Sequence, residues 1–359
     1  MVSVDPRILL QGATPRLIDE WQIEPELWNH VRREVDDRRA PGQFILTGSA
    51  VPPDDITRHS GAGRIVRLRL RPMSLFEAGR STGSISLAAL MEGEAVSAAD
   101  SGVTVQDLAN WVCLGGWPGI QGKDVESALT VVRGYVSELR RSDVHRVDGT
   151  RRDPERIGRF LRSLARNTAS TVAVKTLAVD AGGADGPLAE ETVRLYLSAL
   201  ERLMVTEDLP PWSPSLRSRA RIRAASKRHF VDPSLAAATL RAGPTRLLAD
   251  PESMGLLFES LVLRDLRVYG QALGAEFYHF RDSNDREVDI IIELPDGRWA
   301  AVEVKLGHRT IDAAAEGLLR FASQVDGPPP AALAVIHGFG YGYTRPDGVR
   351  VVPIGALGP

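Results

Sequence analysis

The sequence predicts a multidomain α/β protein, and three observations support this prediction. The chain has 359 residues and 43% of them are apolar, so it can build two or three domains with ordinary cores. Near the amino terminus, two short apolar runs flank a helical pattern, which is the strand, helix, strand order of a parallel sheet. Near the carboxyl terminus, two runs rich in β-branched residues flank a turn sequence, as in a β-hairpin.

The first expected unit spans residues 1–80. Apolar runs over residues 16–18 and 44–46 predict two strands, and apolar spacing over residues 27–35 predicts a helix between them. A right-handed crossover would bring the carboxyl ends of both strands together, where open α/β sheets bind ligands. The polar residues expected at that edge are Asp19, Glu20, Thr47 and Ser49.

The next region, residues 81–150, has the composition of a connector. Before it, residues 66–71 alternate apolar side chains with arginines, which predicts a half-exposed strand. Residues 81–104 are rich in Ser, Gly and Ala and are expected to be a linker or a small helical insert. Gly115 and Gly116 are expected to allow close packing, and a helix is expected over residues 125–143.

Residues 151–244 are expected to form a winged helix-turn-helix unit. Helices are predicted from Asp153-Pro154, over residues 171–179, and from Glu190 onward. The third helix occupies the recognition position but begins with acidic residues, whereas DNA readout favours basic ones. We therefore favour a packing module between domains over a DNA-reading module.

A basic stretch follows, and it could contact the phosphates of a nucleic acid without sequence preference. Alternatively, it is a solvated strand pair docked against acidic neighbours. Its cations are Arg217, Arg219, Arg221, Arg223, Lys227 and Arg228.

The last expected unit, residues 245–359, contains the predicted hairpin. Pro295-Asp296-Gly297 suits a three-residue loop, and this loop would place Asp289 opposite Glu303 and Glu287 opposite Lys305. Direct cross-strand neighbours lie about 4.5–5.5 Å apart, so the carboxylates and the ammonium would converge on one face. The residues expected on the opposite, core-facing side are Ile290, Ile292, Val302, Val304 and Leu306.

Two carboxylates placed opposite each other repel, and a divalent cation would relieve the repulsion. Oxygen ligands from Asp289 and Glu303, completed by water and a phosphate, are typical of magnesium in phosphoryl-transfer sites. Lys305 could then orient an attacking water or stabilise charge on the phosphate. A solvated hairpin face is the alternative, but the chain has only four lysines, so Lys305 is not simply its default surface cation.

Asp289, the Glu303-Val304-Lys305 run and Glu259 on the preceding predicted helix together resemble the PD-(D/E)xK nuclease superfamily. The resemblance implies a restriction-endonuclease-like α/β fold and a Mg²⁺-dependent phosphodiesterase centre. It also implies that Glu259, Asp289 and Glu303 hold the metal and that Lys305 is catalytic. The sequence departs from the pattern where Glu-Val, rather than Pro, precedes Asp289.

The motifs Leu-Ile-Asp-Glu, Leu-Thr-Gly-Ser and Ala-Gly-Arg follow one another within residues 17–64. In this order they resemble the Walker B and sensor-1 elements of AAA+ ATPases, in particular AAA-type ATP-binding proteins with a carboxyl-terminal domain of unknown function. The resemblance implies binding of ATP and magnesium, with the following roles for residues of this chain: Asp19 helps to hold magnesium, Glu20 activates water, Thr47 senses the γ-phosphate, Ser49 joins the nucleotide site, and Arg64 acts as an arginine finger.

One element of that family is missing, because the chain contains no G-x-x-x-x-G-K-[ST] sequence. In the family this P-loop lies well upstream of Walker B, whereas only 18 residues precede Asp19. We therefore expect a truncated P-loop sheet, with weak ATP binding or none, because the phosphates lack their backbone cradle and lysine.

Bulk properties narrow the class of protein further. The formal net charge of −2 gives no global attraction to nucleic acid, and a single cysteine, Cys113, excludes a disulfide framework. We expect a cytoplasmic protein without membrane spans. The function expected is that of an AAA-type ATP-binding protein without its Walker A motif, fused to a nuclease-like domain with a role on nucleic acid, with self-association or a protein partner. The alternatives are an ATP-independent Mg²⁺-dependent DNA nuclease and a non-catalytic interaction module.

Overall fold

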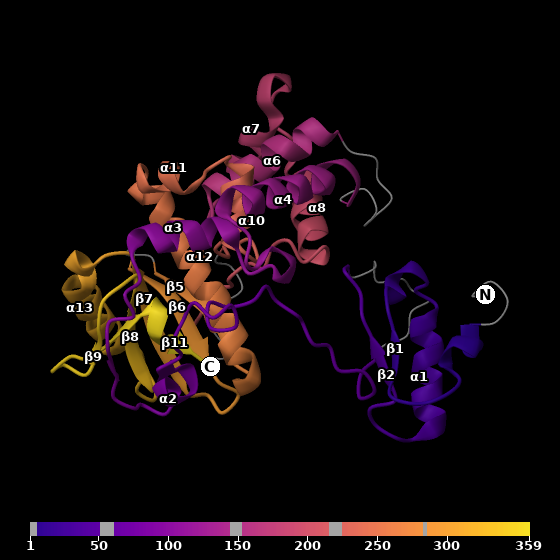
Figure 1. The fold of residues 1–359 in the computed structure, drawn as a ribbon, viewed down its shortest axis with the longest axis horizontal. Coiled ribbons are helices and arrows are strands. Elements are labelled where there is room, and N and C mark those ends of the chain that lie inside the picture. The colour runs from indigo at the N-terminus through magenta and orange to yellow at the C-terminus, as the bar shows by residue number, and fades with distance from the viewer. Residues whose placement is uncertain (1–5, 51–60, 144–152, 215–224, 283–285) are drawn as a thin grey trace.

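The computed structural model describes residues 6–50, 61–143, 153–214, 225–282 and 286–359. Within these residues the protein is a mixed α/β structure, with a helical middle region and a mixed sheet of seven strands (Figure 1). None of the helices in these ranges combines the length and the apolar character needed to cross a membrane.

The amino-terminal unit contains the predicted strand, helix and strand. Strands β1 (Arg16–Ile18) and β2 (Phe44–Leu46) pair in parallel, and helix α1 (Leu27–Arg38) connects them. Buried Ile18, Leu27 and Val31 form a small core with Leu10 from the preceding turn. The parallel crossover expected from the sequence is confirmed (Figure 1).

The strand expected over residues 66–71 is absent, and this segment is extended without a strand partner among the described residues. Arg69 and Arg71 both contact the carboxylate of Glu207, at 3.2 and 2.7 Å. Because the arginines turn toward this acid, the alternating apolar side chains face outward, and Val66 is 93% exposed. The side chains do alternate, but the arginines face the protein because they pair with Glu207, and the apolar side chains face solvent.

Of the two alternatives expected for residues 81–104, the linker is wrong, because the segment pairs with the carboxyl-terminal part of the chain, whereas a small helix is present. Strand β3 (Ile85–Ser86) pairs with β11 (Leu357–Gly358), and β4 (Ser97–Ala98) lies antiparallel to β9 (Gly342–Thr344). Between them, helix α2 (Leu87–Met91) buries Leu87, Leu90 and Met91 in the main core. A composition rich in small residues concealed these few apolar anchors.

The middle region is helical. The helices are α3 (Val105–Leu114), α4 (Val125–Glu138), α6 (Pro154–Arg166), α7 (Val174–Gly182), α8 (Glu190–Arg202), α10 (Pro233–Thr239), α11 (Pro244–Leu248) and α12 (Pro251–Gly270). The helices predicted from Asp153-Pro154 and Glu190 are confirmed, and the one expected over residues 125–143 ends in a π turn, Leu139–Asp143. After α8, isolated bridges join Thr206 to Phe230 and Leu209 to Lys227.

Short 3₁₀ turns complete the chain between these elements. They are Pro6–Leu10, Trp21–Ile23, Pro118–Ile120, Gly183–Asp185, Gln271–Leu273, His308–Thr310 and Ile354–Ala356. The turn before Pro118 needs its glycines for close packing, as expected: a Cβ on Gly116 would lie 2.1 Å from the carbonyl oxygen of Met73.

The carboxyl-terminal sheet has the strand order β4-β9-β10-β8-β7-β6-β5. Its main strands are β5 (Glu276–Arg281), β6 (Glu287–Glu293), β7 (Trp299–Lys305), β8 (Ala332–His337) and β10 (Arg350–Pro353), and helix α13 is Ile311–Ala322. In chain order the unit contains helix α12, strand β5, the predicted β6–β7 hairpin, helix α13 and strand β8. Strand β9 was not predicted.

Helices cover both faces of this sheet. Ile290 and Ile292 belong to the core that includes the apolar side of α12, whereas Ile291 and Trp299 belong to a second core with α13. The predicted hairpin register is also confirmed, because Ile290 pairs with Val302. Gly297 has φ +86°, as its loop position requires.

Candidate active site

The polar residues predicted for the carboxyl-terminal unit gather where β6 and β7 meet α12. Strand β5 shifts its register against β6 here: Tyr278 pairs with Ile291 but Phe280 pairs with Val288. One β5 residue therefore lies opposite both Asp289 and Ile290, which is the pattern of a β-bulge. Such bulges change the direction of nearby side chains. On the other side of β6, the backbone N–H of Val304 donates to Asp289 Oδ2 at 2.9 Å. The bulge and this bond hold the Asp289 carboxylate.

Helix α12 supplies Glu259. The helix begins at the side chain of Asp250, which accepts a hydrogen bond from the N–H of Ser253 at 3.1 Å. The apolar stripe of this helix is buried and consists of Met254, Phe258, Leu261 and Val262. Glu259 lies at the edge of that stripe and is mostly buried beside the sheet.

Lys227 lies at the centre of this group, which the sequence analysis did not foresee. Its Nζ is 3.0 Å from Glu259 Oε1, 2.7 Å from Glu287 Oε1 and 3.4 Å from Asp289 Oδ1. The whole residue is 1% exposed. Glu287, which was expected opposite Lys305, forms its ion pair with Lys227.

The basic stretch is therefore not a continuous surface strip through Lys227 and Arg228. Lys227 points into the carboxylates, and Arg228 forms an ion pair with Asp208. Both cations are paired with acids of the protein, so they do not belong to the surface that was predicted to contact phosphates. The other four predicted cations, Arg217, Arg219, Arg221 and Arg223, lie outside the described residues.

Lys305 lies at the outer side of the centre. Its Nζ is 2.6 Å from Glu303 Oε2 and 3.5 Å from Asp289 Oδ2, and its side chain is 30% exposed. The structure thus brings together Glu259, Asp289, Glu303 and Lys305 from three elements. Asp289 connects the two lysines, because each of its carboxylate oxygens faces one of them.

Burial and mutual repulsion disturb the acidities of these carboxyl groups. Burial, reinforced by the charge of Asp289, raises the pKa of Glu259 to about 8 and that of Glu303 to about 7. Burial would also raise the pKa of Asp289, but the charges of Lys227 and Lys305 lower it. Asp289 is therefore the carboxylate that stays ionised most firmly.

A cavity of about 400 Å³ opens beside the centre. Carboxylates of the centre and hydroxyl groups of the 169–172 segment both contribute to its wall, and Arg281 adds a cation. Its lining includes Ser170, Thr171, Lys227, Glu259, Arg281, Glu287 and Asp289.

The arrangement does not present a prepared magnesium site. No group of three or more His, Cys, Asp or Glu side chains is arranged to hold a metal ion in the part of the chain that the structure describes. Oxygens of Glu259 and Asp289 contact the Lys227 ammonium, which occupies the position between them. A lysine thus supplies the positive charge that the sequence analysis assigned to Mg²⁺.

The amino-terminal candidates also come together, as predicted. Thr47 Oγ1 donates to Asp19 Oδ1 at 2.5 Å, and Ser49 Oγ lies 3.4 Å from Glu20 Oε2. Gln22, which the sequence analysis missed, contacts both Glu20 and Ser49.

The ion pair of Arg64 is with a residue outside that amino-terminal group. Arg64 Nε lies 2.6 Å from Asp36 on α1. The role of arginine finger remains a prediction.

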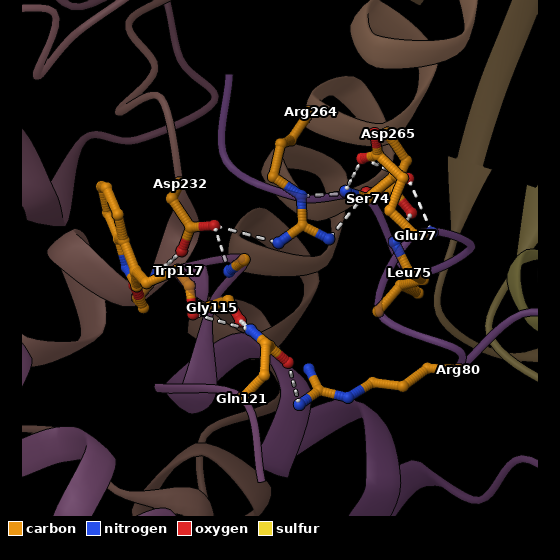
Figure 2. A network of polar contacts seen from close by, with 12 residues as sticks. Ser74, Leu75, Glu77, Arg80, Gly115, Trp117, Gln121, Asp232, Arg264 and Asp265 are labelled. Atoms are coloured by element: carbon orange, nitrogen blue, oxygen red, sulfur yellow. Dashed lines mark hydrogen bonds and ion pairs between the residues drawn. The ribbon is translucent and has the colours of Figure 1, made fainter. Parts of the chain in front are cut away.

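A buried ionic network that includes two residues of α12 was also missed (Figure 2). Arg264 lies 2.9 Å from Asp232 and 2.6 Å from Asp265. Asp232 also accepts from the N–H of Gly116, and Asp265 accepts from the N–H of Leu75. Each carboxylate is thus satisfied by one guanidinium and a backbone donor, which fits a structural role that fixes α12. The N-cap role of Asp232 was predictable, but its pairing with Arg264 was not.

Comparison with known proteins divides the chain into two matched regions. Residues 105–246 match a family described as "Domain of unknown function (DUF8612)". Residues 254–357 match "Domain of unknown function (DUF4143)". The second domain is found in AAA-ATPase-associated proteins. The first match crosses the boundary near residue 150 that the sequence analysis expected.

Two curated mycobacterial proteins resemble most of the chain. They are "Uncharacterized protein Rv2008c" of Mycobacterium tuberculosis and "Uncharacterized protein Mb2031c" of Mycobacterium bovis. Each is 26% identical over 311 residues, which is 84% of this chain and 61% of the relative. The chain therefore spans about three fifths of the length of these curated relatives. No solved structure matches the chain.

Proposed function

We propose that the carboxyl-terminal unit is a nuclease-like domain of the PD-(D/E)xK type and that the protein acts on the phosphodiester backbone of nucleic acid. One observation carries this proposal: Glu259 from α12, Asp289 from β6, and Glu303 with Lys305 from β7 meet at one place on one sheet. The match of residues 254–357 to an AAA-associated domain agrees with attachment to an AAA-type unit.

The residues of this chain suit contact with a phosphodiester. Lys305 is partly exposed and is held by Asp289 and Glu303, so its ammonium can offset negative charge on a phosphate. The Glu303 carboxyl beside it can accept a proton from water. Arg281 and the hydroxyl groups of the cavity wall can donate hydrogen bonds to phosphate oxygens. Magnesium does not fit the present donor arrangement, and no step is assigned to it.

We further propose that residues 1–80 derive from an AAA-type ATPase unit. The contacts of Asp19 with Thr47 and of Glu20 with Ser49 support this proposal. Because the sequence contains no G-x-x-x-x-G-K-[ST] motif, we expect the chain alone to bind ATP weakly or not at all. Calorimetric titration with ATP tests this, and micromolar binding by the chain alone would contradict it.

A second candidate is a non-catalytic interaction module. The observation that favours it is Lys227, whose buried ammonium contacts three carboxyl groups of the acidic centre. In that case the nuclease-like unit would keep its fold and its surface but not its chemistry.

The deciding experiment measures binding and cleavage separately, on the same variants. Binding of a labelled duplex is followed by fluorescence anisotropy at low salt, and cleavage of a supercoiled plasmid is followed with and without Mg²⁺ or Mn²⁺. Lys305→Ala should reduce cleavage about 100-fold, the usual cost of removing one electrostatic stabiliser of a transition state. Lys123→Ala removes an exposed lysine elsewhere and is the matched control.

The outcomes separate the candidates. Cleavage that disappears in Lys305→Ala but persists in Lys123→Ala supports the nuclease. Wild-type protein that neither binds nor cleaves nucleic acid would overturn the proposal and leave the interaction module.

A further inference from the structure

We infer that Lys227 is the built-in cation of the acidic centre and that any divalent cation entering there competes with its ammonium. The inference uses the proposed function only to name the metal expected at such a centre. Which cation occupies the centre can be tested by measuring the affinity of the protein for divalent cations, without any nucleic acid.

The coordination of the Lys227 ammonium is complete. An ammonium group has three N–H donors, and Lys227 Nζ has three carboxylate neighbours, Glu259, Glu287 and Asp289, at 2.7–3.4 Å. These acids come from a helix and from one strand, so the lysine joins elements that would otherwise repel each other. A cation in this position needs no further ligand to balance its charge.

The backbone that delivers Lys227 is braced on both sides. Lys227 N–H donates to the carbonyl of Leu209, and Leu209 N–H donates back to the carbonyl of Lys227, both at 2.9 Å. The next residue, Arg228, exchanges similar bonds with Ala169 and Ser170. The ammonium is therefore placed by a fixed segment of backbone, unlike the tip of a surface lysine.

Removal of the lysine charge should create the site that the intact centre lacks. Without Lys227, the carboxylates of Glu259, Glu287 and Asp289 lose the ammonium that they share, and Lys305 remains only beside the other oxygen of Asp289. Oxygen ligands of this kind prefer hard divalent cations. Lys227→Met keeps an unbranched side chain of similar length but removes the charge. Wild-type protein should accept the cation poorly, because the ion has to expel a buried ammonium.

The test is binding of Mn²⁺, measured by calorimetry and by the loss of the free-ion electron paramagnetic resonance signal. We expect Lys227→Met to bind Mn²⁺ at least tenfold more tightly than wild type. The double variant Lys227→Met/Asp289→Asn should lose that gain, and Lys123→Met should bind as wild type does. Equal affinities for wild type and Lys227→Met, or a gain that survives Asp289→Asn, would overturn the inference.

A second measurement keeps the inference testable if Lys227→Met does not fold. The chain has four lysines, Lys123, Lys175, Lys227 and Lys305, so acylation of amines by a mild reagent can be read residue by residue with mass spectrometry. In metal-free wild type, Lys227 should react at least tenfold more slowly than exposed Lys123. Reaction of both at the same rate would show that Lys227 does not occupy the centre.

These outcomes differ from those of the proposed function. A gain of Mn²⁺ affinity in Lys227→Met, in a protein that neither binds nor cleaves nucleic acid, would retain the inference and reject the nuclease. If wild type cleaves nucleic acid, and wild type and Lys227→Met bind Mn²⁺ with equal affinity, the nuclease is retained and the inference is rejected.

Discussion

Single charged residues inside this protein are balanced by several partners, and Glu207 is an example away from the acidic centre. Its carboxylate lies 2.7 Å from Arg71, 3.2 Å from Arg69 and 3.9 Å from Arg267. Burial would raise the pKa of Glu207, but these three guanidinium groups outweigh it and lower the pKa to about 2. The carboxylate therefore joins the 66–71 segment to α12.

This pKa shift predicts how the stability depends on pH. A carboxyl group whose pKa is lowered by folding stabilises the protein above its unfolded pKa, here 4.5, and loses that contribution as the pH falls toward 2. Glu207→Gln should lower the free energy of unfolding by about 2 kcal/mol at pH 7. In urea titrations, the gap between wild type and variant should narrow steadily below pH 4.5. A gap that is unchanged at pH 3 would contradict this assignment.

At the residue scale, the sequence predicted those site members that local geometry brings together. Asp289, Glu303 and Lys305 follow from the turn and from strand alternation, because both rules act over a few residues. Lys227 could not be predicted in the same way. Its partners come from α12 and β6, far along the chain. The run of arginines around it suggested either a contact with phosphates or a solvated strand pair docked against acidic neighbours, without naming those acids.

At the scale of elements, the β6–β7 hairpin depends on its loop. Leu294 N–H donates to the carbonyl of Arg298 at 2.8 Å, and Gly297 lies between them with φ +86°. This left-handed conformation suits glycine and strains residues with a Cβ. Because the loop fixes the register, it also fixes where Asp289 and Glu303 lie.

Two glycine substitutions should therefore have opposite effects. Gly297→Ala should destabilise the protein by about 1 kcal/mol, because alanine is strained at this φ. Gly255→Ala, inside α12, meets no atom within 4 Å and should stabilise the helix by about 0.5–1 kcal/mol. Thermal unfolding of both variants beside wild type checks the signs. A midpoint that does not fall in Gly297→Ala would contradict the strained loop, and a midpoint that falls in Gly255→Ala would contradict the helix prediction.

Helices and strands were predictable where the pattern of their own residues indicates them. Strands were missed where they form only by pairing with a segment far away in the sequence. The two-residue strand β4 has no alternation to recognise, and its partner β9 lies near the other end of the sequence. The 66–71 segment had the alternation of a strand, but Glu207 attracted its arginines away from solvent.

At the scale of the whole molecule, the Arg264 network joins segments that are distant in sequence (Figure 2). Through Asp265 it binds the backbone of Leu75, and through Asp232 it binds the backbone of Gly116 and caps α10. All of these contacts converge on α12, the helix that also carries Glu259. The order of these elements was predictable from sequence, but their mutual attachment was not, because each contact joins residues that only the fold brings together.

Loss of this arginine should therefore loosen several elements at once. Arg264→Met leaves the buried carboxylates of Asp232 and Asp265 without their cation, and breaking a buried pair in this way costs about 3–5 kcal/mol. Arg194→Met, which removes an exposed ion pair with Glu190, is the control and should cost less than about 0.5 kcal/mol.

Hydrogen exchange distinguishes a shared attachment from a local one. If the network holds the molecule together, amides of α3, α10 and α12 should lose protection together in Arg264→Met, while those of α1, which belongs to a separate core, should keep theirs. Loss of protection confined to α12 would mean that the arginine stabilises only its own helix. The positions of Glu259 and Lys227 would then depend on the sheet and its bridges, and Arg264→Met would leave the slow acylation of Lys227 unchanged.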